Sequence, residues 1–582
     1  MDKETKICQN CKQEFVIEPD DFDFYEKMKV PAPTWCPTCR LQRRFVWRNE
    51  WKLFRKKDVH GKEIFSNYHE DSPVKIMETA EWYSDSWDPM EYGRDYDFSR
   101  PFLEQFKELF YQVPLMSRLL INPVRSDFSS NITEPKDCYL SFAASYLENS
   151  AYSIWGAKSK DIFDCYIFNE SELCYDSVNI NKCYRTFYSI DCEDCSEIIF
   201  CKNCIGCNNC FGCVNLKNKS YYIFNEPYSK EKYLEKVKEF ETSSRRNVEI
   251  LRKQATDYWL KFPNKFIHGR HNTDVSGDYI NNSKNAKHCW RTIGGENIKY
   301  CQNFSIGPVK DSYDQSNFGD GSELIYESLV VGKGAYDVAF SAQCFSSVSN
   351  LKYCVCCCQN VSYLFGCVSL RNKQYCILNK QYTKEEYETL LPKIISHMNQ
   401  MPYIDKKGRI YKYGEFFPAE MSPSAYNETI ANDYFPLTKE QAEEQGFIWY
   451  EQKNKEFNAT KNGTKLPDNI KDVDDSILKE IIKCDHEGKC EHECVGVFRI
   501  TNQELQFYRK FNIPLPQICQ NCRHYARFAW RNPPKLWHRQ CMCDKENHSH
   551  GKARCANEFE TSYAPDRPEI VYCESCYQQE VA

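Results

Sequence analysis

The sequence has no stretch that approaches eighteen consecutive apolar residues, and its first six residues are not followed by an apolar run. A membrane-spanning helix and a secretory signal peptide are therefore not expected. The chain also lacks a strong excess of charge, because 76 Lys and Arg face 82 Asp and Glu and leave a net charge of −6. Overall charge thus indicates neither a nucleic-acid nor a membrane partner, and only local clusters can do so.

The motifs of common enzyme classes are missing as well. The chain contains no G-x-G-x-x-G, no nucleotide-binding P-loop, no H-E-x-x-H and no G-x-S-x-G. Residual candidates for chemistry include His268, Asp278 and Asp314. Acids in the turns of repeat proteins are mostly solvated, so we expect a non-catalytic protein. The alternatives are a solenoid-based hydrolase of the carbohydrate type and a protein–protein interaction scaffold without nucleic acid.

Cysteine, by contrast, is abundant, with 34 residues in a chain of 582. This length predicts three to five domains and excludes a small disulfide-stapled peptide. Because no signal peptide is expected, we predict a cytoplasmic protein, in a compartment that keeps thiols reduced. The cysteines are therefore expected to bind metal or to fill a core.

Two internal duplications organise the chain. The segment 211–228 returns as 365–382, a shift of 154 residues, which indicates two similar large modules, each closed by a helix. Within the first module, a series of cysteines nine residues apart runs from Cys165 to Cys210. This short period predicts a β-solenoid. We expect two nines, about 18 residues, in each coil, because nine extended residues span only about 30 Å.

The second duplication lies at the two ends of the chain. Cys11 and Cys36 are 25 residues apart, as are Cys494 and Cys519. Cys494 lies 483 residues after Cys11. With this shift of 483 residues, Phe24-Tyr25 matches Phe507-Tyr508, Cys39-Arg40 matches Cys522-Arg523, and Trp47-Arg48-Asn49 matches Trp530-Arg531-Asn532. The two ends are therefore copies of one module.

Two Cys-x2-Cys pairs in the N-terminal copy, Cys8 with Cys11 and Cys36 with Cys39, supply the four thiolates that tetrahedral zinc prefers. Unrelated structural cysteines rarely form two such pairs. The pattern Cys-x2-Cys-x3-Phe, followed by Pro-x4-Cys-x2-Cys-Arg, resembles the probable zinc-ribbon domain family over residues 6–45 and, in the other copy, 488–528. The resemblance implies a zinc-binding fold and no particular activity.

The C-terminal copy is predicted to bind two zinc ions, which gives about three in the protein. The spacing does not decide whether Cys484 or Cys490 completes the first site, nor which two of three upstream cysteines complete the second. In the N-terminal copy Glu78 and Glu81 stand where the second site has its last two cysteines, so no zinc is expected there. The candidate ligands are Cys490, Cys494, Cys519, Cys522, Cys541, Cys543, Cys555, Cys573 and Cys576, and Cys484, His486 and His492 lie near the first site.

The run from Cys201 to Cys213 has a cysteine at every third position, and C-x2-C-x2-C is also an iron–sulfur pattern. The Cys-Pro that accompanies such clusters is missing. Most of these cysteines belong to the nine-residue repeat, in which they are expected to be small residues of the core. We therefore favour buried structural thiols over an iron–sulfur cluster.

Basic and aromatic side chains follow the second cysteine pair in both copies, and the local net charge from Cys36 to Lys57 is +7. Such side chains can bind phosphates and stack on bases, so RNA or a ribonucleoprotein is one expected partner, and a protein on the solenoid face is another. It is equally open that the arginines pair with carboxylates of a neighbouring lobe. The residues concerned are Arg40, Arg43, Arg44, Trp47, Arg48, Arg523, Arg527, Trp530 and Arg531.

The expected fold is multidomain and mainly β, with two tandem β-solenoid modules flanked by zinc-ribbon modules and a few connecting α-helices. We assign 1–92 to the N-terminal zinc-ribbon module, 93–125 to a helical connector, 126–260 and 261–400 to the two solenoid modules with their closing helices, 401–480 to a connector and flexible linker, and 481–582 to the C-terminal zinc-ribbon module. The function expected from this organisation is that of a non-catalytic, cytoplasmic zinc-binding scaffold with no membrane partner.

Overall fold

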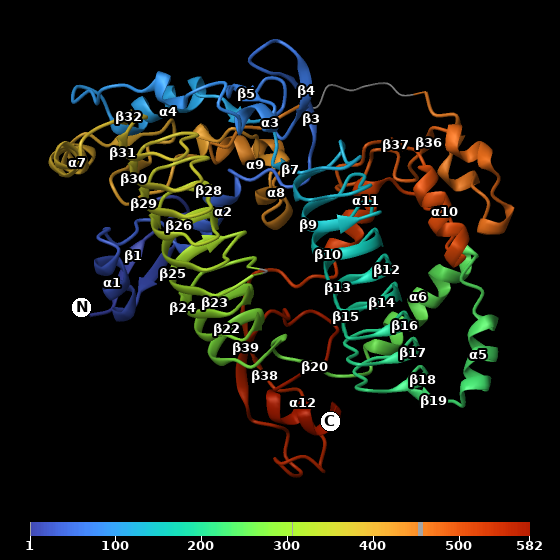
Figure 1. Cartoon of the computed structure of the whole chain (residues 1–582). Helices are drawn as coiled ribbons and strands as arrows, with labels where there is room; N and C mark the ends of the chain where they lie inside the picture. Colours follow the sequence, from blue (N-terminus) through green and yellow to red (C-terminus); the bar gives the residue numbers. More distant parts are fainter. Residues whose placement is uncertain (1, 305, 452–457, 582) are drawn as a thin grey trace.

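The computed structural model describes residues 2–304, 306–451 and 458–581 of the chain. Two β-solenoids stand side by side with their axes in opposite directions, so that the first descends and the second climbs in Figure 1. The N-terminal module packs on the second solenoid, and the C-terminal module packs on the first solenoid and, through its second half, on the beginning of the second. The predicted multidomain, mainly β fold with solenoids in the middle is thus confirmed.

The first solenoid has 12 residues in each coil, and the expected 18 is wrong. Ile154 pairs in parallel with Tyr166, and Tyr166 with Val178. The strands are β7 (Leu120–Ile121), β8 (Ser130–Thr133), β9 (Phe142–Glu148), β10 (Ile154–Phe163), β11 (Tyr166–Asn169), β12 (Glu172–Tyr175), β13 (Val178–Asn181), β14 (Tyr184–Phe187), β15 (Ile190–Glu193), β16 (Ser196–Ile199), β17 (Asn208–Phe211), β18 (Ser220–Ile223) and β19 (Glu226–Pro227).

The coil is this short because the backbone turns at every third residue. Asp161, Asp164 and Ile167 have φ angles of 54°, 53° and 65°, in the left-handed region that Asn and Asp tolerate best. The residue after each turn points inward, and Ile162 and Cys165 are at most 1% exposed. A turn at every third residue gives a 12-residue coil with four sides. Cysteines nine residues apart are then separated by three of these sides.

Such a narrow interior has room only for compact side chains. It also contains backbone N–H and C=O groups that need hydrogen-bond partners. The Ser153 hydroxyl accepts a hydrogen bond from the backbone N–H of Cys165 at 3.1 Å, one coil further on. The Cys183 thiol donates to the backbone carbonyl of Cys192 at 3.4 Å. Serine and cysteine recur inside the coil because they occupy little volume and satisfy these backbone groups.

The second solenoid is less regular, with coils of 11 to 14 residues. The added residues break the strict spacing of its cysteines. Its strands are β21 (Gly269–Arg270), β22 (Thr273–Asn281), β23 (Lys284–Ile293), β24 (Gly295–Lys299), β25 (Val309–Ser316), β26 (Ser322–Gly332), β27 (Tyr336–Ala339), β28 (Ala342–Phe345), β29 (Val348–Lys352), β30 (Val361–Phe365), β31 (Gln374–Ile377) and β32 (Lys380–Gln381).

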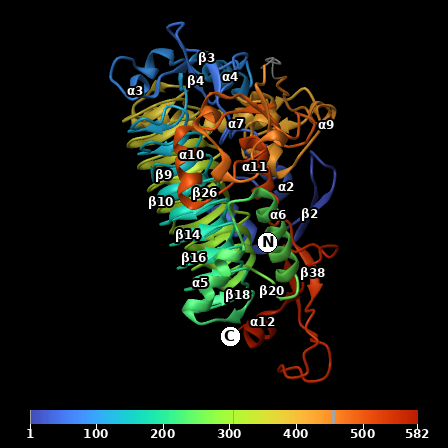
Figure 2. The ribbon, with the colours of Figure 1, turned by 90° about the vertical axis from the view of Figure 1, so that its right-hand side faces the viewer.

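Each solenoid ends in the same way. Its last parallel strand pairs with a short antiparallel strand, β18 with β19 and β31 with β32. Helix α5 (Lys230–Glu239) then packs on β18, and α7 (Lys384–Gln400) on β31. Figure 2 shows α5, α6 (Arg245–Trp259) and α10 (Asn502–Phe511) on one side of the first solenoid. The added strand is only two residues long, and short edge strands of this kind offer little for another chain to pair with.

The two terminal modules repeat one order of elements, in agreement with the duplication. The N-terminal module has β1 (Glu4–Ile7), β2 (Glu14–Ile17), α1 (Pro19–Lys27), α2 (Pro37–Phe45), β3 (Phe54–Lys57), β4 (Glu63–Ser66), β5 (Ile76–Met77) and α3 (Thr79–Trp82). The C-terminal module has β36 (Ile482–Lys483), β37 (Val497–Phe498), α10, α11 (Gln520–Phe528), β38 (Trp537–Gln540), β39 (Glu558–Thr561), β40 (Val571–Tyr572) and α12 (Glu574–Val581).

The connecting segments are packed against the modules. Helix α4 (Phe102–Gln112), in the predicted helical connector, buries Phe102, Phe106 and Phe110, and α8 (Ile430–Tyr434) packs against α2. Residues 452–457 of the expected flexible linker lie outside the described residues, but Ile470 and Ile477 beyond them are buried in the core of the C-terminal module. Among the described helices, none combines the length and the apolar character that crossing a bilayer requires.

Candidate metal centres

Four cysteines of the N-terminal module gather where the turn between β1 and β2 meets the start of α2. Cys8 and Cys11 belong to the turn, Cys36 precedes α2, and Cys39 lies in its first turn. Their Sγ atoms lie within 4.8 Å of one another, and those of Cys11 and Cys36 are 3.8 Å apart. Metal–sulfur bonds of about 2.3 Å in a tetrahedron give a sulfur–sulfur edge of about 3.8 Å. The four predicted ligands are therefore arranged for a closed tetrahedral site.

The first C-terminal group repeats this arrangement. It consists of Cys484, Cys494, Cys519 and Cys522. The Sγ of Cys519 lies 3.8 Å from that of Cys494 and 3.5 Å from that of Cys522. In both modules the backbone N–H of the third cysteine donates to the Sγ of the first at 3.2 Å. The position that the sequence leaves open is thus occupied by Cys484, and Cys490 lies outside this group.

A second C-terminal group lies between the β38–β39 hairpin and α12. It consists of Cys541, Cys555, Cys573 and Cys576, all of them buried. The backbone N–H of Cys573 donates to the Sγ of Cys541 at 3.2 Å, as in the other two groups. The Sγ atoms of Cys555 and Cys573 are 3.9 Å apart. Of the three upstream candidates, Cys543 is the one outside this group.

The last two cysteines of each group stand at the N-terminus of a helix, where the helix dipole favours thiolates. Hydrogen bonds with the thiols of Cys484 and Cys522 lower the pKa of Cys519 to about 4. Burial raises the pKa of Cys573, but hydrogen bonds, first from Asn557, outweigh burial and bring this pKa to about 7. These two positions therefore favour the deprotonated form that a metal ligand requires.

Two further groups combine histidine with cysteine. They consist of His486, Cys490, His492 and Cys522, and of Cys543, His548, His550 and Cys576. The Sγ of Cys543 lies 3.1 Å from Nδ1 of His548 and 3.3 Å from Nε2 of His550. His548 and His550 are not among the ligands predicted from the sequence, although closely spaced histidines beside cysteines are a signal of metal ligands.

The N-terminal copy differs at the place of the second C-terminal group. Glu78 precedes α3 and Glu81 lies within it, in the positions of Cys573 and Cys576. The Glu81 carboxylate lies 2.7 Å from Nε2 of His60. The loop between β3 and β4 is short, residues 58–62, whereas residues 541–557 join β38 to β39. The part of the loop that carries ligands in one copy is missing from the other.

Most of the solenoid cysteines lie inside the coils, whereas Cys356 and Cys358 belong to the core that the second solenoid shares with the N-terminal module. Cys201, Cys204 and Cys207 are at most 1% exposed, and the Cys201 thiol donates to the carbonyl of Ile199 at 3.5 Å. None of the ligand groups found in the described ranges includes a solenoid cysteine, whereas all fourteen cysteines outside the two solenoids belong to such groups. The geometry agrees with structural thiols in the run from Cys201 to Cys213.

The arginines of α2 point into the interface with the second solenoid. Arg40 and Arg44 contact Asp314 at 2.7 and 3.0 Å, and Arg43 contacts Glu327 at 2.8 Å. All five side chains are at most 1% exposed. In place of the phosphate contacts expected for these arginines, the structure has ion pairs with the protein's own carboxylates, which was the alternative interpretation.

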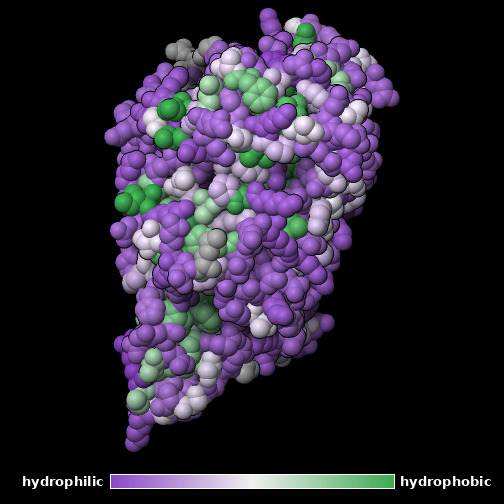
Figure 3. Space-filling view, turned by 90° about the vertical axis from the view of Figure 1, so that its left-hand side faces the viewer, coloured by the Kyte–Doolittle hydropathy of each residue, from purple (hydrophilic) through white to green (hydrophobic). Residues whose placement is uncertain are grey.

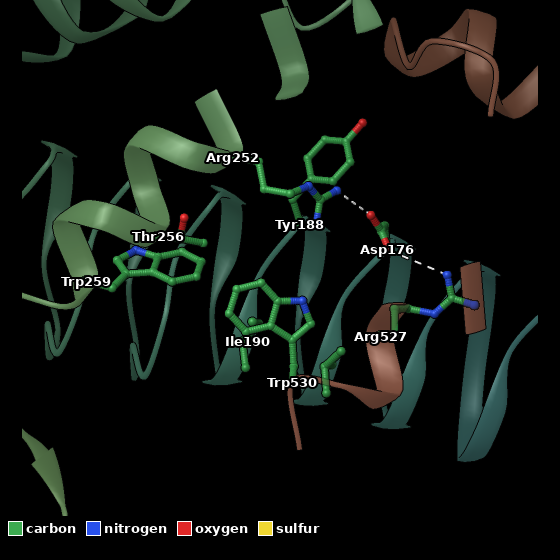
Figure 4. A pocket seen from close by; sticks show the side chains of 9 residues that line it. Asp176, Tyr188, Ile190, Arg252, Thr256, Trp259, Arg527 and Trp530 are labelled. Atoms are coloured by element: carbon green, nitrogen blue, oxygen red, sulfur yellow. Dashed lines mark hydrogen bonds and ion pairs between the residues drawn. The ribbon is translucent and has the colours of Figure 1, made fainter. Parts of the chain in front are cut away.

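The C-terminal module repeats this interface on the first solenoid. Arg523 and Arg527 of α11 both contact Asp164 at 2.9 Å. Asp176 lies between Arg252 and Arg527 (Figure 4), at 2.5 and 3.5 Å. Burial raises the pKa of Asp176, but the two guanidinium groups outweigh burial and lower this pKa below its usual range. Each terminal module is therefore attached to a solenoid by buried ion pairs.

Most of the other residues expected to bind nucleic acid are also buried or in contact with other side chains of the protein. Trp47 is 2% exposed, Arg48 is 7% exposed, and Trp530 is 37% exposed. The guanidinium of Arg531 stacks over the ring of Tyr434 at 4.0 Å. Of the nine residues, Trp530 alone presents a substantial surface to solvent.

The residual catalytic candidates make internal contacts, and two cavities are too small for a substrate. Nδ1 of His268 lies 3.0 Å from the carboxylate of Asp278, and Asp314 contacts Arg40 and Arg44 of α2. The cavities have volumes of about 10 and 20 Å³, enough for about one water molecule each. Trp259 and Trp530 line the smaller one (Figure 4). The face in Figure 3 is largely hydrophilic, with small scattered hydrophobic groups.

Comparison with known proteins gives no assignment. No family model matches the chain, and no curated protein matches it. Among solved structures, a protein described as an acetyltransferase from Desulfovibrio desulfuricans G20 has 10% identity and a TM-score of 0.09, over 50% of this chain and 86% of that chain. A likeness this weak carries no argument, and the resemblance of the terminal modules to the zinc-ribbon family stays a prediction.

Proposed function

We propose that this protein is a non-catalytic, cytoplasmic scaffold in which zinc-bound terminal modules hold two solenoids in one rigid frame. The observation that carries this proposal is that metal ligands and docking residues share a helix. Helix α2 carries Cys39 next to Arg40, and α11 carries Cys522 next to Arg523. A metal ion that fixes the first turn of either helix thereby fixes the arginines that bind the solenoid.

Zinc is the metal that these ligand sets favour. Four thiolates in a closed tetrahedron are typical of structural zinc, with no position left for water. Metal binding of this kind contributes about 10–16 kcal/mol in zinc-finger peptides. None of the 34 cysteines, all of them within the described residues, is paired in a disulfide, which supports a reducing compartment such as the cytoplasm.

The frame is closed by contacts between the two terminal modules as well. The ring of Trp51 lies 4.9 Å from the ring of His524, and Lys52 contacts Glu493 at 2.5 Å. Each module therefore touches a solenoid and the other module. A frame closed in this way presents its solenoid faces to a macromolecular partner in a fixed relation.

A protein is the partner class that we favour over RNA. The arginines expected to bind phosphates are held by buried carboxylates, and releasing them would leave those carboxylates without partners. RNA or a ribonucleoprotein remains the second candidate because Trp530 is exposed beside basic residues. Purification at low and at high salt separates the two, since nucleic acid held by phosphate contacts dissociates steeply with salt.

The test of the proposed function is removal of the metal. The full-length protein, purified without chelator, should contain zinc by elemental analysis. A chelator should lower its melting temperature and enlarge its radius of gyration in small-angle X-ray scattering. The Cys204→Ser variant is the matched control, because it alters a cysteine inside the solenoid and should leave the zinc content unchanged. Iron in place of zinc, or a melting curve unaffected by the chelator, would contradict the proposal.

A further inference from the structure

We propose that the C-terminal module binds metal as two binuclear clusters, in each of which one cysteine thiolate bridges two ions. The bridging residues are Cys522 and Cys576, each of which belongs to two ligand groups. With the single site of the N-terminal module, the protein then binds five ions rather than about three. This inference rests on the proposed metal-binding function and specifies its sites.

The composition of the ligand groups supports two ions in each cluster. Two tetrahedral ions need eight ligand positions, and seven residues fill them when one thiolate is shared. Each cluster has five cysteines and two histidines. They are Cys484, His486, Cys490, His492, Cys494, Cys519 and Cys522 in one cluster, and Cys541, Cys543, His548, His550, Cys555, Cys573 and Cys576 in the other.

The sulfur of Cys522 stands where a bridging ligand must stand. It lies 3.5 Å from the sulfur of Cys519 and 3.9 Å from that of Cys484, both in the four-cysteine group. It also lies 3.7 Å from the sulfur of Cys490, in the group that contains histidine. All three distances are close to the edge of about 3.8 Å of a tetrahedron of zinc-bound sulfurs. The sulfur of Cys522 is therefore a common corner of two tetrahedra.

Both clusters use their ligands in the same order along the chain. The first ligand belongs to the four-cysteine group, the next three belong to the group with histidine, and the fifth returns to the four-cysteine group. The third ligand of the four-cysteine group then precedes a helix, and the bridging cysteine lies in its first turn. Two separate segments of different length keep this order. A hydrogen-bonded cluster without metal does not require the same order twice.

The N-terminal module has the same fold but, among its described residues, no histidine-containing ligand group beside its four cysteines. Only Gln9 and Asn10 separate Cys8 from Cys11 there. The amide of Asn10 donates to the sulfur of Cys39 at 3.3 Å. Because Cys39 is the counterpart of Cys522, an amide occupies the side of the sulfur that faces a second ligand group in the C-terminal module. The N-terminal sulfur is therefore arranged for one ion and the C-terminal sulfur for two.

The histidines of the first cluster have a further property that a metal explains. The Nδ1 atoms of His486 and His492 are buried and have no hydrogen-bond partner among the described residues. A buried ring nitrogen without a partner is costly. The two rings lie with their centroids 5.5 Å apart, beside Cys490. Binding of the imidazoles to a metal ion offsets this cost.

The experiment is elemental analysis combined with NMR of the full-length protein loaded with cadmium-113. We expect five ions in each chain and five cadmium signals. Four of the signals should form two coupled pairs, because scalar coupling between two cadmium ions passes through a shared sulfur. The Cys490→Ser/His492→Ala variant should lose one ion and the coupling of one pair, and should keep the signal of the four-cysteine group.

The Asn10→Ala variant is the matched control, since it changes the amide that faces Cys39 and should keep all five ions. Three ions with no coupled signals would overturn the binuclear clusters and leave the proposed function intact. Five signals without coupling would overturn the shared thiolate. A protein that binds no metal would overturn both the inference and the proposed function.

Discussion

Replacing Asp314 by Asn should destabilise the protein more than removing Arg44, although the two residues form one ion pair. The cluster at this interface contains three arginines and three carboxylates, and every side chain in it is at most 5% exposed. Its members are Arg40, Arg43, Arg44, Asp314, Glu327 and Glu415. The positive and negative charges in the intact cluster balance.

The two substitutions differ because a carboxylate can take up a proton and a guanidinium cannot lose one. Asp314→Asn leaves an excess buried positive charge, and losing one partner of a buried ion pair costs about 3–5 kcal/mol. Arg44→Met leaves an excess negative charge next to Glu327. Burial raises the pKa of Glu327 above its ordinary value, so this carboxyl can be neutralised by a proton. The cost of Arg44→Met should therefore be smaller.

The same argument predicts a pH dependence for the Arg44→Met variant. An acid whose pKa is raised in the folded state contributes stability that is fully present below its unfolded pKa. That stability is lost as the pH rises through the folded pKa. Without Arg44 the pKa of Glu327 should rise further, and the variant should approach the wild type in stability at mildly acidic pH and fall behind it at neutral pH.

The measurement is the urea midpoint of the full-length protein at both pH values, by circular dichroism. Asp311→Asn is the matched control, because Asp311 lies on the same strand and pairs with Lys27 at the surface, where such pairs contribute about 0–1 kcal/mol. Equal midpoints for Asp314→Asn and Asp311→Asn would refute the buried cluster. An Arg43→Gln/Arg44→Gln variant that keeps the urea midpoint of the wild type but no longer binds RNA would also refute the buried cluster.

Three further substitutions test the packing. Cys204→Ala should cost about 1–2 kcal/mol with an unchanged metal content, because it leaves a small cavity inside a coil; loss of a visible chromophore would instead indicate a cluster. Trp47→Ala should cost about 3–5 kcal/mol, since this ring is buried, whereas Trp530→Ala should cost much less in the same melting assay. A larger effect at Trp530 would show that its surface is covered in solution.

The ligand groups could be predicted from the sequence wherever the ligands are close together in it. Cys36 and Cys39 stand in one helical turn, so their spacing alone places both sulfurs on one side. The spacing does not identify Cys484 as a ligand, because its counterpart Cys8 lies only three residues from Cys11 and the inserted segment between Cys484 and Cys494 hides the match. The histidines of that insertion, His486 and His492, stand beside the cysteines and are predictable as nearby ligands. His548 and His550 lie in the other insertion, between Cys543 and Cys555, which has no equivalent in the N-terminal copy, so comparison of the copies does not reveal them.

The coil length was mispredicted because cysteine spacing shows only a multiple of the true period. Nine and twelve are both multiples of three, and the strand register decides between them. The inward serines Ser153, Ser171 and Ser177 keep the same phase as Cys165 and would have shown the period of three. The partners of the arginines were beyond such reasoning, because Asp314 is 274 residues from Arg40.

The difference between the two terminal copies follows from how much apolar surface each can bury. In the N-terminal copy, Ile76, Met77 and Trp82 join the large core that includes α4. In the C-terminal copy, the corresponding segment from β38 to α12 extends from the end of the frame (Figure 1), and its small core consists largely of the cysteines themselves, with Tyr572 and Tyr577. A segment this small cannot stabilise itself by burial alone and needs covalent or metal cross-links. The copy that the large core supports therefore keeps its fold without the second ligand group, whereas in the other copy the proposed metal ions would supply the cross-links that burial does not.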